Sequence, residues 1–305
     1  MAFFKKSASQ NFDLYSTHAF YTPGVGGMFM LLALMLLGSL LGSLIVGIVK
    51  ICGIDLNQDW TLLISYPCMF VPPMVYASYK GRNNLMFDKG YSLDSNNFAP
   101  KGALAAALWA VAGMLGLSVV IDPVNSLLPP MPKWLEDLLG SLTGGDFWIN
   151  FICVSIFAPI FEEWLCRGMV LRGLLNRKKE DGSPLMSPAW AIVISAIFFG
   201  VIHLNPWQAI PAIAMGILMG YVYYKTGSLK ITMLMHFANN TMALILGHID
   251  SLKDMDSFMD VMPTTVYAIF LGVSVALVVG CIFAFRCIAP LRREGSCDEV
   301  SPSVE

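Results

Sequence analysis

Long apolar runs alternate with short polar connections over most of the chain. A helix that spans a membrane needs about 20 mostly apolar residues, because its backbone polar groups must be satisfied within the segment. Eight runs qualify: 25–51, 61–79, 102–121, 147–171, 189–204, 207–224, 229–247 and 264–285. The pattern predicts an all-α fold, a polytopic membrane bundle of about eight transmembrane helices.

The composition excludes an ordinary soluble enzyme. Hydrophobic residues make up 56% of the 305 residues and charged residues only 13%, whereas a typical soluble domain carries about 25% charged residues. The net charge of −2 gives no electrostatic reason to expect nucleic acid as a partner. The lipid bilayer is the expected surrounding.

The distribution of charge predicts an orientation. Basic residues concentrate in the N-terminal arm, in every second connection and in the C-terminal tail, whereas the other connections are mainly acidic. Lys and Arg accumulate in cytoplasmic loops of membrane proteins. We therefore expect a multi-pass protein with both termini in the cytoplasm, located in the cell membrane if the source is bacterial.

Three regions follow from these segments. Residues 1–146 contain three predicted spans and an interfacial segment, in which a proline-rich turn precedes a short amphipathic helix at 134–139. Residues 147–247 form a predicted core of four spans, and residues 248–305 contain the last helix and a cytoplasmic tail.

Ionisable and amide side chains interrupt three of the apolar segments. A charged side chain in hydrocarbon costs about 2.5–3.5 kcal/mol on insertion scales, so its presence indicates a function. The fourth segment contains Glu162, Glu163 and Arg167, the fifth ends near His203, and the seventh contains His236 and Asn240.

Spacing within each segment indicates which of these side chains lie together. Glu163 and Arg167 are four residues apart and can pair on one helix face. Glu162 lies about 100° around the same helix and has no partner of opposite charge on it. The same spacing of four places Phe199 beside His203 and His236 beside Asn240. An unpaired carboxylate near two imidazoles is suited to activating a water molecule.

Each group also has a simpler explanation. The charges on the fourth segment could reach the membrane surface from a helix end. His203 could cap a helix, and His236 with Asn240 could join neighbouring helices by hydrogen bonds. Three such pairs on three segments favour one shared site.

The three motifs Glu162-Glu163-x-x-x-Arg167, Phe199-x-x-x-His203 and His236-x-x-x-Asn240 resemble, in this order, those of the CAAX-protease-and-bacteriocin-processing family, also called CPBP or Abi proteins. These are integral membrane endopeptidases. The resemblance implies that Glu162 is the general base for an attacking water and that His203 positions this water. It further implies that His236 and Asn240 stabilise the oxyanion, while Glu163, Arg167 and Phe199 hold the architecture.

The resemblance implies a membrane-associated protein or peptide as the substrate. It allows cleavage behind a prenylated cysteine, trimming of a leader peptide, or self-immunity against a bacteriocin. The active-site cavity is expected to open near the basic side of the membrane. No cofactor is favoured; Zn²⁺ would use Glu162, His203 and His236, but an amide such as Asn240 is a poor zinc ligand and a good oxyanion donor.

Two other functions remain open at this point. Buried Glu, His and Asn side chains also suit a proton-coupled secondary transporter, although the sequence shows no pair of matching halves. A non-catalytic scaffold that binds membrane peptides is the third possibility.

Depth in the membrane sets a condition on a shared site. Counting along the predicted helices, at about 1.5 Å per residue, places His203 nearer the outer side than Glu162 or His236. We therefore expect either that the first turns of the fifth helix project into the cytosol or that the hairpin at 205–207 is sunk within the protein.

Overall fold

The structure is a computed structural model that describes residues 21–84, 93–143, 145–252, 255 and 257–290. Its regular elements are helices, and among the described residues the only β-type pairing is an isolated bridge between Lys178 and Pro184. The elements are α1 (Val25–Ile51), α2 (Gln58–Asn84), α3 (Ala103–Asn125), α4 (Lys133–Thr143), α5 (Phe147–Asn150), η2 (Phe151–Phe157), α6 (Ala158–Glu163), η3 (Trp164–Leu171), α7 (Arg172–Asn176), α8 (Pro188–Val201), α9 (Pro206–Thr226), α10 (Leu229–Gly247), η4 (Phe258–Asp260) and α11 (Thr264–Arg286). The all-α prediction is confirmed.

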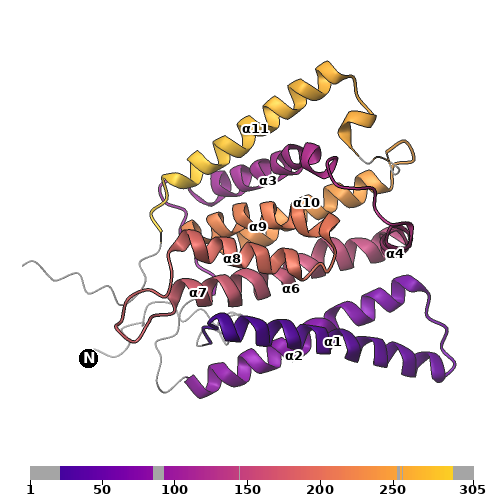
Figure 1. Cartoon of the computed structure of the whole chain (residues 1–305), viewed down its shortest axis with the longest axis horizontal. Helices are drawn as coiled ribbons and strands as arrows, with labels where there is room; N and C mark the ends of the chain where they lie inside the picture. The colour runs from indigo at the N-terminus through magenta and orange to yellow at the C-terminus, as the bar shows by residue number, and fades with distance from the viewer. Residues whose placement is uncertain (1–20, 85–92, 144, 253–254, 256, 291–305) are drawn as a thin grey trace, which may run out of the picture.

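The helices lie in three groups (Figure 1). The α1–α2 hairpin forms one side, α3 and α11 form the other, and the helices from α5 to α10 lie between them. The central group therefore packs against protein on two sides, and it carries the polar residues singled out above.

Among the residues that the structure describes, five helices are long and apolar enough to cross a membrane, as expected for a multi-pass membrane protein. They are α1, α2 as far as Gly81, α3, the continuous helix Phe147–Asn176, and α11. Helix α8 has 14 residues and spans only about 21 Å, while α9 and α10 carry more polar side chains. A helix surrounded by other helices need not be uniformly apolar. The count of eight spans and the cytoplasmic termini remain predictions.

The central helix Phe147–Asn176 is not a regular α-helix. Residues of η2 and η3 adopt the wider π-helical hydrogen-bonding pattern, which is often found at functional sites. At the end of η2 the N–H of Ala158 donates to the carbonyl of Cys153, five residues back. The next residue, Pro159, has no N–H. The Val154 carbonyl therefore lacks a donor from its own helix.

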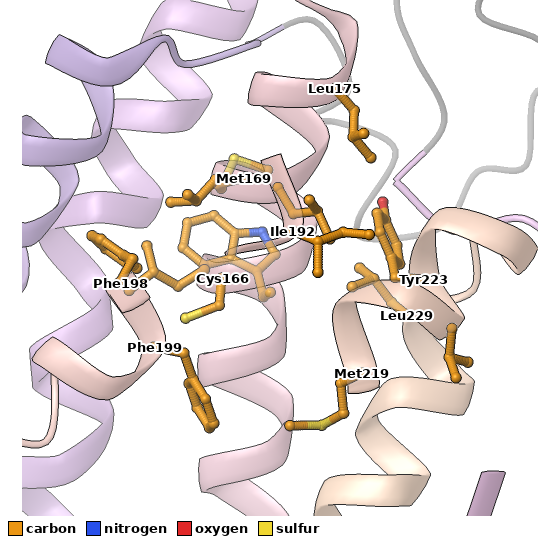
Figure 2. Close-up of a cluster of buried hydrophobic side chains, with 14 of the residues drawn as sticks. Cys166, Met169, Leu175, Ile192, Phe198, Phe199, Met219, Tyr223 and Leu229 are labelled. Carbon is orange, nitrogen blue, oxygen red and sulfur yellow. The ribbon is translucent and has the colours of Figure 1, made fainter. Parts of the chain in front are cut away.

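The core surrounds η3, all eight residues of which are buried. Figure 2 shows Cys166 and Met169 of this segment among Phe198, Phe199 and Met219 of the neighbouring helices. At Gly216 on α9, an added Cβ would lie 3.0 Å from the Ala196 Cα. Glycine at this position allows α8 and α9 to approach closely, as small residues do in membrane helix pairs.

In the connection between the third and fourth predicted spans, the structure agrees with one part of the sequence prediction and corrects another. The expected short helix is present as α4. However, α3 continues to Asn125, so Asp122 is not a loop residue. Asp122 is buried and its Oδ2 accepts hydrogen bonds from Ser257 Oγ at 2.8 Å and Tyr267 Oη at 2.9 Å. It joins α3 to α11 because a buried carboxylate requires donors.

Candidate active site

Glu162 lies between two helices that come from different parts of the chain. Tyr66 on α2 donates its hydroxyl to Glu162 Oε1 at 2.5 Å, and His236 Nε2 on α10 lies 3.9 Å from Glu162 Oε2. This second oxygen accepts no hydrogen bond from the described residues. The Glu162 side chain is 13% exposed. The carboxylate is thus held at one oxygen and lacks a direct donor at the other.

Glu163 lies on the other face of the helix and is fully buried. Its Oε1 accepts a hydrogen bond from Arg167 Nη1 at 2.6 Å and lies 3.1 Å from His236 Nδ1. Because a carboxylate oxygen only accepts, His236 Nδ1 carries the proton in this contact. Glu163 therefore fixes both a buried guanidinium and the tautomer of His236.

Phe199 contacts three of the charged or titratable side chains. The Arg167 guanidinium carbon lies 4.5 Å from the centre of its ring. The rings of His203 and His236 pack edge to face against it, with centroids 5.1 and 5.5 Å away. The motif residue Phe199 therefore joins the fourth, fifth and seventh predicted segments.

His203 lies in the turn after α8, not within the helix as predicted. Its Nδ1 is 2.8 Å from the Phe199 carbonyl oxygen. Since a carbonyl oxygen is only an acceptor, Nδ1 donates, and Nε2 of the neutral ring is left as an acceptor. His203 can thus accept a hydrogen from a water molecule at Nε2.

Asn240 is hydrogen-bonded to the backbone of the helix that carries Glu162. Its Nδ2 donates to the Val154 carbonyl at 2.9 Å, the same carbonyl that the π-helical pattern and Pro159 leave without an intrahelical donor. Asn240 and His236 are both absent from the wall of the cavity described below. Their predicted role as oxyanion donors stays a prediction.

This geometry makes a testable prediction for Asn240. Asn240→Ala should lower the melting temperature in detergent, because it leaves a part-buried carbonyl unsatisfied, and for a fully buried one the cost is about 1–3 kcal/mol. Pro159→Ala supplies an N–H that can reach the Val154 carbonyl. The double variant should therefore recover most of the lost stability. Additive destabilisation in the double variant would contradict this assignment.

A cavity of about 470 Å³ borders Glu162. Its other polar wall residues are Tyr66, His203, Asn205 and Gln208. The apolar wall comes mainly from α1, α2 and α4: Met35, Met69, Phe70, Trp134, Leu135 and Leu139. The size is within the range of about 300–1,000 Å³ that is usual for small-ligand sites.

The position of the cavity differs from the sequence prediction. We expected an opening near the basic connections, but the cavity lies beside α4, whereas the basic connection at 177–179 lies at the other end of the central helices (Figure 1). The reason is that α4 and the α8–α9 turn close over Glu162 from the same end of the bundle. Only the tertiary structure contains this information.

The α8–α9 turn also explains how His203 comes to border the same cavity as Glu162. Helix α8 is short, so the turn at 202–205 lies within reach of Glu162. On its outer side Trp207 Nε1 donates to the Pro129 carbonyl at 2.8 Å, which fastens the start of α9 to the segment before α4. The turn is nevertheless not enclosed by protein, because Leu204 is 72% exposed; its depth in the membrane stays a prediction.

The three side chains considered as zinc ligands are Glu162, His203 and His236. Over the described residues there is no group of three or more His, Cys, Asp or Glu side chains that could hold a metal. In both histidines Nδ1 is hydrogen-bonded, to Glu163 or to the Phe199 carbonyl, which leaves Nε2 available, as is usual in a metal-bound histidine. Because these three side chains are not grouped as a ligand sphere among the described residues, no metal is favoured, and the absence of a metal stays a prediction.

Sequence reasoning missed several residues of the site. Tyr66 could not be recognised from the sequence, because one tyrosine in an apolar segment looks like an ordinary core residue. For Asn205 and Gln208 the sequence does contain a local pattern. Asn before Pro206, with Gln three residues later, is the signature of a helix start with a reciprocal cap.

Comparison with known proteins agrees with the resemblance found in the motifs. Residues 144–242 match the family described as "Rce1-like: Type II CAAX prenyl endopeptidase Rce1-like", so this part of the chain is similar to that family. No curated protein and no solved structure matches the chain. All seven motif residues lie within the matched range, whereas Tyr66 and α4 lie outside it.

Proposed function

We propose that the chain is a CAAX-type intramembrane endopeptidase in which Glu162 activates the attacking water. The observation that carries this proposal is that Glu162 and His203, brought from different helices, border one mostly apolar cavity. A carboxylate and an imidazole that border the same mostly apolar cavity are suited to general-base catalysis.

The geometry supports the following steps. A water molecule in the cavity donates one hydrogen to Glu162 and the other to His203 Nε2. Its oxygen attacks the carbonyl carbon of the peptide, and Glu162 takes the proton as the new C–O bond forms. When the C–N bond breaks, the proton passes to the leaving nitrogen. Tyr66 holds the carboxylate through Oε1, and Glu163 holds the His236 ring beside it.

The cavity wall supports a substrate with an apolar group. Methionine, phenylalanine and leucine side chains form most of it, and flexible methionines adapt to irregular hydrocarbon shapes. A lipid-modified cysteine next to the cleaved bond would bury its chain against these side chains. This agrees with the substrate class in the family description.

The first test is direct cleavage of a defined peptide. The purified protein in lipid nanodiscs should release the last three residues of a peptide that carries a farnesylated cysteine before them, as detected by mass spectrometry. The same peptide without the farnesyl group should be cut much more slowly, because the apolar wall then has no partner. No cleavage of either peptide would contradict the proposal, and equal cleavage would contradict the assigned role of the wall.

A chelator tests the metal question in the same assay. Treatment with 1,10-phenanthroline should leave the rate unchanged, because the residues around Glu162 do not form a zinc site. Stoichiometric zinc in the active protein, lost together with activity and restored by adding Zn²⁺, would overturn the direct glutamate mechanism.

A further inference from the structure

Peptide hydrolysis needs a hydrogen-bond donor at the place where negative charge develops on the carbonyl oxygen. The Asn240 amide is bonded to the Val154 carbonyl, and neither His236 nor Asn240 borders the cavity. The His203 ring presents an acceptor there when it is neutral. A donor for the oxyanion should therefore be sought among the other polar residues of the cavity wall.

The orientation of the Gln208 amide follows from its neighbours. Asn205 Nδ2 donates to the His203 carbonyl at 2.9 Å, which identifies this atom as the nitrogen because a carbonyl only accepts. The same Nδ2 donates to Gln208 Oε1 at 2.7 Å. The oxygen of the Gln208 amide is thus directed toward Asn205, and its Nε2 is left with no acceptor among the described residues.

The backbone holds this arrangement firmly. Asn205 caps α9 by accepting the Gln208 backbone N–H at 2.9 Å on Oδ1. Leu204 just before it has a φ of 58°, a left-handed conformation that is uncommon for residues other than glycine. The turn therefore carries His203 at one end and Gln208 at the other, both on the cavity wall.

We propose that Gln208 Nε2 donates a hydrogen bond to the substrate carbonyl oxygen and stabilises the negative charge that forms on it during hydrolysis. This inference rests on the proposed endopeptidase function. Asn205 acts as a positioning residue, because it touches Gln208 and not the substrate. In this proposal the Gln208 amide, and not the Asn240 amide, donates the hydrogen bond to the substrate carbonyl oxygen.

Two substitutions separate catalysis from structure. Gln208→Glu keeps an oxygen that accepts the bond from Asn205 but removes both donor hydrogens. It should lower kcat on the farnesylated peptide by about 10²–10³-fold, with KM and the melting temperature near those of the wild type. Gln208→Met keeps the approximate shape without a donor or a new charge, and it should lower kcat to a similar extent.

The outcomes distinguish this inference from the proposed function. If the wild type cleaves the peptide and Glu162→Gln does not, but Gln208→Met keeps kcat within about threefold, the assignment of Gln208 is wrong and the endopeptidase function stands. If Gln208→Glu lowers the melting temperature as much as Gln208→Met, with KM raised and kcat unchanged, the role is structural and the inference fails. If the wild type does not cleave, the proposed function itself fails.

Discussion

Glu162→Gln should abolish peptide cleavage while the protein remains folded and at normal abundance. The amide keeps the shape of the side chain and can still accept the hydrogen bond from Tyr66, which is 2.5 Å in the wild type, but it cannot take a proton from water. Loss of a general base typically lowers the rate by about 10²–10⁴-fold. The measurement is the initial rate of farnesyl-peptide cleavage in nanodiscs, together with the melting temperature of the same samples.

Tyr66, which donates a hydrogen bond to Glu162, offers a matched control for this substitution. Tyr66→Phe removes the donor to Glu162 without changing the carboxylate, so it should reduce the rate much less than Glu162→Gln. Near-normal turnover of Glu162→Gln would show that another group activates the water, and it would exclude the mechanism proposed here.

Glu163→Ala should destabilise the protein strongly. The Glu163 and Arg167 side chains are both fully buried, with their charged atoms 2.6 Å apart. Removing one partner of a buried ion pair leaves an uncompensated charge and typically costs about 3–5 kcal/mol. The substitution also removes the acceptor of His236 Nδ1. Abundance in membranes, melting temperature and activity should therefore fall together, and Arg167→Ala should have the same effect.

Glu180→Ala is the control for this second result. Glu180 is an exposed glutamate in the connection between α7 and α8, so its removal should leave abundance and melting temperature unchanged. A Glu163→Ala variant that is as stable as the wild type but inactive would show that Glu163 takes part in the chemistry. The separate roles assigned to the two adjacent glutamates would then be wrong.

The sequence by itself determined the all-helical class and the helices that carry the site. Apolar periodicity and length are local properties, so the segments from α1 to α11 were recognisable without knowledge of their packing. The Glu163–Arg167 pair was predictable for the same reason, because a spacing of four residues fixes proximity on one helix. Ionisable residues in apolar segments also stand out, since their cost in hydrocarbon demands a partner or a function.

Only the tertiary structure decided how these residues face one another. Tyr66 reaches Glu162 from a helix 96 residues earlier in the chain, and no local pattern marks such a contact. Asn240 has the spacing of a site residue, four positions after His236. However, its amide donates to the Val154 carbonyl, which has no donor from its own helix because Pro159 lacks an N–H. The position of the cavity beside α4 and the placement of Gln208 on its wall likewise depend on how the α8–α9 turn folds over the central helix. These features arise from contacts between distant segments, which sequence spacing does not determine.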